Sequence, residues 1–145
     1  MQSNPRIRPA RLDDAPAVWP LAREFATSFV PRREAFAATF AALVDAPQTL
    51  LLVAETPEPE IVGYLLASSR PTFHANGPVV WVEEVMVADA VRRVGVGRSL
   101  MQAAEQWAIE SDAAYVSLAS RRAQDFYRAL DYEDSATYFK KTLRP

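Results

Sequence analysis

The sequence contains no cysteine and a single histidine, His74. Without cysteine the chain can form no disulfide framework and no thiolate zinc site, and it has no cysteine nucleophile. One imidazole cannot supply a multi-histidine metal site, and it argues against a Ser-His-Asp triad. We therefore expect no bound metal ion, and we interpret His74, which lies among loop-forming residues, as a solvated side chain.

Long apolar runs are absent as well. Leu50–Ala54 is one of the longest, whereas a membrane-spanning helix needs about 20 apolar residues. The opening residues 1–6 are not followed by the apolar stretch of a signal peptide, which favours a cytoplasmic location. A net charge of −2 gives no general electrostatic reason to bind nucleic acid. We expect neither a membrane nor a nucleic acid as partner, and the acidic balance leaves room for a cationic amine.

The chain has the size and composition of one folded domain. Its 145 residues, half of them hydrophobic, can bury roughly 70% of the surface that the unfolded chain exposes. No internal repeat, linker or low-complexity stretch marks a second domain. We therefore expect a single domain over residues 1–145.

Hydrophobic periodicity predicts alternating helices and strands. We expect extended segments at residues 6–10, 49–55, 61–68, 79–87, 114–118 and 136–143, and helices at about 14–25 and 33–45, after Gly97 and around 123–130. Pro20 interrupts the first helix, which predicts a kink or a later start. This order indicates an α/β fold with one central sheet and helices on its faces.

The segment Arg92–Ser99 joins a predicted strand to an amphipathic helix and carries the clearest chemical signal. Its two glycines allow backbone to approach a ligand closely, and the free amides of the first helical turn favour an anion such as a phosphate. Its arginines suit phosphate oxygens. The segment lacks the Lys-Ser/Thr of a P-loop and the third glycine of a dinucleotide fingerprint. The alternative is a tight turn that carries solvated arginines.

This segment resembles the acetyl-CoA motif of the GNAT superfamily of acyl-CoA-dependent N-acyltransferases, Gln/Arg-x-x-Gly-x-Gly/Ala, through Arg92, Gly95 and Gly97. Val87, eight residues before Gly95, occupies the position of a valine that the family places at the end of its fourth strand. The resemblance extends to the Ala-x-x-Phe-Tyr near the C-terminus (Ala123, Phe126 and Tyr127), the third strand (61–66) and the opening segment (6–10 with Asp14 and Ala15).

The resemblance implies a GNAT-like domain, with a central mixed twisted sheet flanked by helices and with splayed fourth and fifth strands. It also implies transfer of an acetyl group from acetyl-CoA, the co-substrate, to a primary amine of a small molecule or peptide. The amine attacks directly in a ternary complex, so no cysteine is required. The implied cofactor-binding residues are Val85, Met86, Val87, Arg92, Arg93, Val94, Gly95, Val96, Gly97, Arg98, Ser99 and Ser120.

Three residues depart from the family pattern. Arg93 stands where many members have a further glycine, Ser120 where many have an asparagine, and Asp131 replaces the glycine of Leu-Gly-Phe/Tyr. Ser120 keeps the hydrogen-bonding capacity of a hydroxyl but loses the longer reach of an amide. We expect the fold to tolerate all three, and Arg93 to change how the loop holds the pyrophosphate.

Candidate catalytic groups follow from the resemblance. Glu83 is the first choice as base, acting directly or through water. Alternation along a strand places Glu83 and Glu84 on opposite faces, so only one can face a given cleft. A β-bulge would exchange the two and make Glu84 the base. The alternative for either residue is a surface carboxylate.

Tyr127 resembles the family's proton donor to the departing thiolate, and its alternative is an amphipathic core tyrosine. A backbone amide around Met86 or Val87 would stabilise the oxyanion, and the pantetheine amides would use the same strand. Phe29 and Phe73 lie in loops that could line an acceptor pocket. The other function that the sequence allows is a non-catalytic acyl-CoA-binding sensor or protein-interaction module, and a homodimer is compatible with either.

Overall fold

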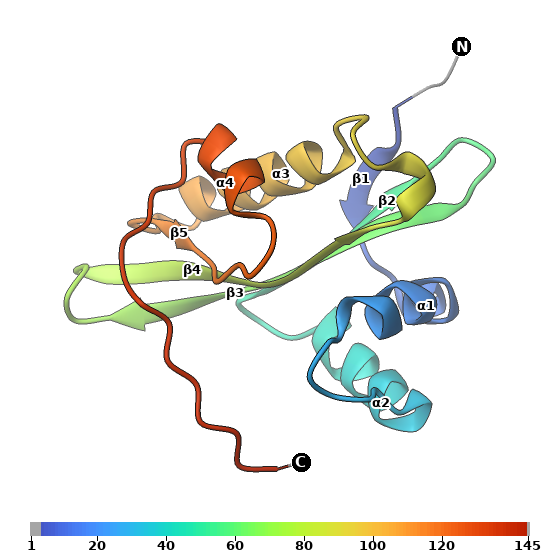
Figure 1. Cartoon of the computed structure of the whole chain (residues 1–145), viewed down its shortest axis with the longest axis horizontal. Helices are drawn as coiled ribbons and strands as arrows, with labels where there is room; N and C mark the ends of the chain where they lie inside the picture. The colour runs from blue at the N-terminus through green and yellow to red at the C-terminus, as the bar shows by residue number, and fades with distance from the viewer. Residues whose placement is uncertain (1–3, 145) are drawn as a thin grey trace.

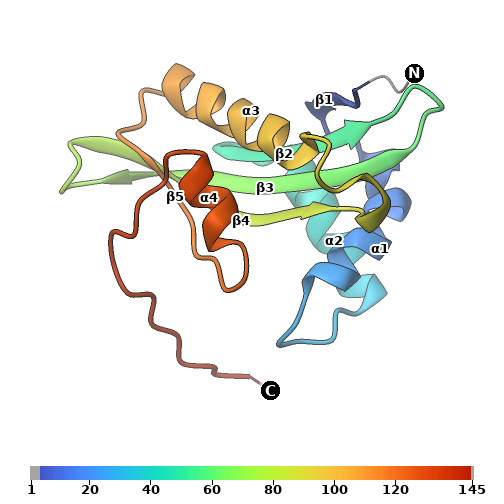
Figure 2. The same cartoon turned by 45° about the horizontal axis from the view of Figure 1, so that its top comes forward.

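The computed structural model describes residues 4–144; the first half of the opening stretch 1–6 lies outside them. A five-stranded sheet in the order β1-β2-β3-β4-β5 forms the centre. Two helices, α1 and α2, cover one face, and α3 and α4 cover the other (Figures 1 and 2). The strands are β1 (Arg6–Pro9), β2 (Thr49–Glu55), β3 (Ile61–Thr72), β4 (Gly77–Val87) and β5 (Val116–Ser117), and the helices are α1 (Ala15–Phe25), α2 (Arg33–Val44), α3 (Val96–Glu110) and α4 (Gln124–Ala129).

The sheet is mixed. β1 to β4 are antiparallel, whereas β5 runs parallel to β4. β5 pairs with β4 only at Val80↔Val116 and Trp81↔Ser117, although β4 continues to Val87. The expected splay of the fourth and fifth strands is therefore confirmed, and β5 is shorter than the predicted 114–118. Beyond Trp81, the edge of β4 that faces β5 lies open.

Each face of the sheet has its own apolar core. Leu65 packs with Leu100 and Met101 of α3, and none of the three has measurable exposure. The adjacent residue Tyr64 points the opposite way and packs with Phe40 of α2. Full burial of such side chains contributes roughly 1.5–3 kcal/mol each. Strand alternation thus divides neighbouring residues of β3 between two hydrophobic layers.

The helices on the α1 side follow the predicted pattern. α2 ends one residue before the predicted 45, and α1 begins at Ala15 directly after a short 3-10 turn, Leu12–Asp14. Pro20 lies inside α1 without ending it. Its missing N–H leaves one carbonyl of the preceding turn without a helical partner, which a solvent-facing position tolerates.

A buried ion cluster connects β1, β2 and the start of α1. Arg8 donates two hydrogen bonds to Asp14, at 2.8 and 2.9 Å, and two more to Glu55, both at 3.1 Å. The Arg8 guanidinium holds the pKa of both carboxyls below their usual range, and both carboxylates raise the pKa of Arg8. Each charged side chain of this cluster therefore has a partner of opposite charge within the chain.

The last segment is extended, as the pattern at 136–143 predicts, but it pairs with no strand. Residues 133–144 are all exposed and lead away from the sheet (Figures 1 and 2). Among residues 4–144, no helix has both the length and the apolar character needed to cross a membrane.

Candidate active site

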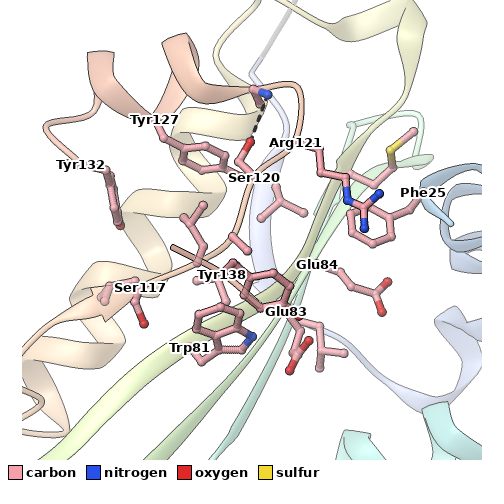
Figure 3. A pocket seen from close by; sticks show the side chains of 18 of the residues that line it. Phe25, Trp81, Glu83, Glu84, Ser117, Ser120, Arg121, Tyr127, Tyr132 and Tyr138 are labelled. Atoms are coloured by element: carbon pink, nitrogen blue, oxygen red, sulfur yellow. Dashed lines mark hydrogen bonds between the residues drawn. The ribbon is translucent and has the colours of Figure 1, made fainter. Parts of the chain in front are cut away.

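An open pocket lies beside the splayed strands. Phe25 lines it from the end of α1 and Phe29 from the α1–α2 connection, and Trp81 and Glu84 line it from β4. Tyr127 of α4 projects into it from the opposite wall (Figure 3). The pocket therefore joins the open edge of β4 to the helix that resembles the family's C-terminal motif.

The two glutamates of β4 do not alternate. Leu66 pairs with Glu84 and Ala67 pairs with Val82, so Glu83 is an extra residue, a β-bulge. Val82 and Val85 both pack in the core beneath α3. Both carboxylates lie outside that core and line the pocket (Figure 3). The expectation that their side chains point to opposite faces is wrong, because the bulge adds one residue to the count.

Glu84 is the more shielded of the two carboxylates. Burial raises the pKa of Glu84, a hydrogen bond from Tyr64 lowers it in part, and the charge of Glu83 raises it again. The Tyr64 hydroxyl donates to Glu84 Oε1 at 2.6 Å. Glu83 is exposed. Among the described residues, neither glutamate takes part in an ion pair. The pocket thus contains a partly buried carboxylate with a hydrogen-bond donor but without an ion pair, although arginines such as Arg121 line the same pocket (Figure 3).

Tyr64 was not apparent from the sequence as a functional residue. It is 3% exposed, and burial together with the adjacent carboxylate raises its pKa. The hydroxyl consequently stays protonated and acts as a permanent donor to Glu84. Its sequence context, an apolar strand, indicates only core packing, and the register between β3 and β4 is what brings it to Glu84.

Tyr127 has the position expected for a group that acts within the pocket. Its ring packs edge-to-face against Phe126 and Tyr132, with centroid distances of 4.9 and 5.9 Å. Burial raises the pKa of Tyr127. The phenol therefore remains in its proton-donating form, but transfer of that proton to a thiolate is more uphill than for an ordinary phenol.

The Arg92–Ser99 turn leads into α3 as predicted. Gly95 precedes the helix with a φ of 90°, and Ser99 N–H is the first to bond back, to Gly95 O at 3.0 Å. The first-turn amides of Val96, Gly97 and Arg98 consequently have no acceptor within the helix. Their exposed end of α3 is a suitable place for an anion.

The backbone at Arg93 has the conformation of a glycine position, which relates this departure to the family pattern. Its φ of 69° lies in the left-handed region, where glycine is favoured and other residues lose about 1 kcal/mol or more. The backbone here keeps the shape that a glycine would suit, and the exposed guanidinium is an addition. Arginine therefore adds a positive charge to the loop at a backbone position that suits glycine.

Arg92 has a structural role in the same turn. Its Nε donates to the carbonyl of Val87 at 3.1 Å, and its guanidinium forms an ion pair with Asp89. These contacts tie the end of β4 to the loop before α3. All three arginines are exposed, but Arg92 is engaged within the chain, whereas Arg93 and Arg98 form no ion pair among the described residues.

Gly97 is explained by packing between helices. A Cβ at this position would lie 3.2 Å from Cζ of Phe126, so the Phe126 ring would have to shift by a few tenths of an ångström. At Gly95 the same added atom would contact nothing, and the positive φ alone favours glycine. Gly97 therefore lets the Phe126 ring of α4 pack closely on α3, a reason that the sequence motif does not reveal.

Ser120 lies after β5, in the loop that leads to α4. Its Oγ accepts a hydrogen bond from Ala123 N–H at 3.0 Å, drawn dashed in Figure 3. This bond stabilises the turn before α4. The hydroxyl proton is still available to a ligand.

Two aromatic residues in the pocket escaped the sequence analysis. Trp81 and Tyr138 stack with centroids 6.2 Å apart and an interplanar angle of 15°. Of the two loop phenylalanines, Phe29 lines the pocket, whereas Phe73 is fully exposed in the β3–β4 turn. His74 lies in the same turn, exposed as expected, at hydrogen-bonding distance from the Tyr115 hydroxyl (2.9 Å). Within residues 4–144 no three histidine, aspartate or glutamate side chains gather as metal ligands would.

Comparison with known proteins identifies the family. The model of the acetyltransferase (GNAT) family matches residues 11–132. An aminoglycoside N(6')-acetyltransferase type 1 of Klebsiella aerogenes is 30% identical over 117 residues, covering 74% of this chain and 73% of that protein.

Solved structures share the fold. A transcriptional regulator from Bacillus halodurans C-125 superposes with a TM-score of 0.83 at 25% identity, covering 96% of this chain and 99% of that one. The aminoglycoside N-acetyltransferase AAC(6')-Iy in complex with CoA superposes with a TM-score of 0.84 at 18% identity, covering 99% and 98%. The matched segment contains the Arg92–Ser99 turn, both glutamates and Tyr127. The chain therefore belongs to the GNAT family and is an acyl-CoA-dependent N-acetyltransferase.

Proposed function

We propose that the chain transfers the acetyl group of acetyl-CoA to an amine of a small, polycationic acceptor of the aminoglycoside class. The observation that carries this proposal is the pair Glu83 and Glu84, which line one pocket and form no ion pair with the described cations of the chain, including those, such as Arg121, that line the same pocket. A partly buried carboxylate without a counter-charge is costly, and a cationic ligand offsets that cost. The Klebsiella relative supports an amino sugar as the acceptor.

The donor site in this proposal is the start of α3. The free first-turn amides of Val96, Gly97 and Arg98 would bind the pyrophosphate, with added charge from Arg93. The pantetheine would lie along the open edge of β4, whose backbone beyond Trp81 has no strand partner. An amide near Met86 or Val87 would meet the oxyanion.

Proton transfer in the proposed reaction uses groups on both walls of the pocket. Glu84 takes a proton from the attacking amine, directly or through one water, because its raised pKa makes it a better base than an ordinary carboxylate. The exposed Glu83 attracts the cationic acceptor. The amine nitrogen bonds to the thioester carbon, the carbon–sulfur bond breaks, and Tyr127 donates its proton to the thiolate. Solvent then restores the phenol.

An assay of thiol release tests the proposal. Purified chain is mixed with acetyl-CoA and an aminoglycoside that carries a 6'-amine, and with a matched aminoglycoside that has a 6'-hydroxyl in its place. We expect release of CoA thiol with the amine and little above background with the hydroxyl. Absence of acetyl transfer to any amine in a panel, despite acetyl-CoA binding, would favour the non-catalytic binding module instead.

A charge reversal tests the donor site. Arg98→Glu places a negative charge beside the first-turn amides of α3, and Arg98 is exposed and unpaired by the described carboxylates. Titration calorimetry should show weaker acetyl-CoA binding, while Arg70→Glu, on the far part of β3, should bind as the parent does. Equal affinities of the two variants would move the pyrophosphate away from this turn.

A further inference from the structure

The end of β4 presents the backbone groups of two valines at its open edge. Ala88 N–H, one residue past the strand, donates to the carbonyl of Val62 at 2.8 Å, and the register between β3 and β4 is unbroken from Val85 to Val87. In an antiparallel pair, the backbone groups of successive residues face the partner strand and the opposite side in turn. The N–H and C=O groups of Val85 and Val87 therefore face away from β3. On that side β5, within residues 4–144, pairs only further back along β4 (Figure 2).

One of these backbone groups is bonded to a side chain of the same molecule. Arg92 Nε donates to Val87 O at 3.1 Å, and Arg92 Nη2 lies 3.9 Å from Met86 Sδ. The guanidinium also forms an ion pair with Asp89, in the short 3-10 turn Asp89–Val91 that follows β4. Each of these contacts is made with β4 or with the turn after it. At Val87, Arg92 thus takes the place of the strand partner that β5 does not supply.

These contacts suit a role in holding the end of β4 in place. The part of a strand without a partner strand opens more easily than the paired part, whereas groups that contact a reacting molecule must be held within about 0.5 Å. The bond to the Val87 carbonyl restrains a residue whose N–H faces the same open edge. A carbonyl oxygen has two lone pairs, so Val87 O can still accept an N–H of a ligand. Arg92 therefore acts on the backbone beside the site without filling the site.

We propose that Arg92 is a positioning residue for acetyl transfer: through Val87 it holds the edge of β4 along which the thioester end of acetyl-CoA lies, and it does not bind the pyrophosphate. This inference rests on the placement of the pantetheine in the proposed function. The pyrophosphate is then left to the first-turn amides of α3 and to Arg93 and Arg98, which form no ion pair among the described residues. The three arginines of one motif thus serve two different parts of the donor.

Steady-state kinetics separate the two possible roles of Arg92. Arg92→Met keeps an unbranched side chain and removes both the hydrogen-bond donor and the charge. A positioning role predicts that kcat falls roughly 10- to 100-fold, because small misplacements of reacting groups are costly, while the KM for acetyl-CoA changes little. Arg98→Met should give the opposite pattern, with its loss mainly in KM. A higher KM with parental kcat in Arg92→Met, or parental values of both constants, would overturn the proposal.

Two further variants separate the bond to Val87 from the other contacts of Arg92. Asp89→Asn removes the exposed ion pair but leaves the Nε bond, and it should keep both constants near those of the parent. Arg92→Lys keeps a donor on the same side chain and should recover part of the kcat that Arg92→Met loses. An Asp89→Asn variant as impaired as Arg92→Met would assign the effect to the loop and contradict a role through Val87.

Amide NMR tests the same inference without turnover. In the parent, saturating acetyl-CoA should shift the N–H signals of Val85, Val87 and Gly97. In Arg92→Met the shift at Gly97 should remain, and the shifts at the two valines should become smaller. Loss of the Gly97 shift alone, or unchanged shifts at all three positions, would overturn the proposal. Valine signals that acetyl-CoA does not move in the parent would refute the donor placement and this inference with it, whereas a failure of transfer to the acceptor leaves this test in force.

Discussion

Two groups of shielded carboxylates lie in different parts of this fold and have opposite surroundings. Asp14, at the start of α1, and Glu55 of β2 share the guanidinium of Arg8 of β1, and their pKa values are lowered. At β4, Glu84 meets a neutral donor, Tyr64, and its pKa is raised. Where the fold supplies the cation, the charges stabilise the structure. Glu84 forms no ion pair within the described chain, and we propose that a cationic ligand pairs with it.

The two groups have opposite effects on stability as pH changes. Asp14 has a lowered folded pKa, so its contribution is present above the unfolded value of about 3.9 and is lost as pH falls through the folded pKa. Glu84 has a raised folded pKa, so stability is greatest below the unfolded value of about 4.3 and is lost as pH rises through the folded pKa. At neutral pH the ionised Asp14 therefore adds to the stability of the fold, and the ionised Glu84 subtracts from it.

The largest expected effect comes from removing the built-in cation. Arg8→Met leaves Asp14 and Glu55 as shielded charges without a partner, and the free energy of unfolding should fall by about 3–5 kcal/mol. Arg6→Met is the matched control. Arg6 is exposed and lies 3.9 Å from Glu55, at the outer limit of an ion pair, so its loss should lower the free energy of unfolding by about 0–1 kcal/mol. Urea titration of both variants measures the difference, and similar losses would remove the distinction between the two arginines.

The next change removes the open charge. Glu84→Gln should lower kcat near neutral pH by roughly 100-fold or more, with a smaller loss at high pH where the acceptor amine is already neutral. The free energy of unfolding at neutral pH should stay level or rise, because an uncompensated charge is lost.

Glu83→Gln is the matched control for Glu84. The exposed Glu83 should affect acceptor KM more than kcat. A kcat loss confined to Glu83→Gln would return the base role to Glu83. If neither variant shows a pH-dependent loss of kcat, solvent deprotonates the amine.

Removal of the hydroxyl on the opposite wall has a comparable or smaller effect. Tyr127→Phe should lower kcat roughly 10- to 1,000-fold, since water can partly replace the phenol as acid, and acetyl-CoA affinity should change little. Tyr132→Phe, which loses a hydroxyl bonded to Glu105, is a control for packing and should affect stability more than turnover. Parental kcat in Tyr127→Phe would remove the phenol from the reaction.

The smallest effect is expected at the neutral donor. Tyr64→Phe removes the hydrogen bond that lowers the pKa of Glu84, so that pKa should rise further. The acid limb of the kcat profile should move to higher pH, with a stability loss of about 1 kcal/mol. A stability loss with an unmoved profile would limit Tyr64 to packing.

Local patterns predicted much of this fold. β2 forms over the predicted 49–55, and α2 ends within one residue of its predicted end, because period and flanking turn residues act locally. The motif at Arg92–Ser99 likewise predicted the strand-to-helix turn. These features depend on neighbours in the sequence.

The pocket depends on long-range register, which the sequence does not reveal. Glu83 forms a bulge because the register between β3 and β4 shifts by one residue at this point. The same register brings Tyr64 to Glu84. The packing of Phe126 against Gly97 is a further tertiary contact. The sequence therefore predicted Glu83, Glu84 and Tyr127 as candidates but not the orientation of the two glutamates. It missed Tyr64, Trp81 and Tyr138.

The most direct test of the contrast between the two charge groups is the titration of the Glu84 carboxyl by carbon NMR, with Glu84→Gln used to assign its signal. The account predicts a midpoint above the ordinary glutamate value of about 4.3 in the free protein, and a lower midpoint when a polycationic aminoglycoside is bound. A Glu84 midpoint near the ordinary glutamate value in the free protein, or a midpoint that saturating acceptor leaves unchanged, would contradict the proposal that Glu84 binds a cationic ligand.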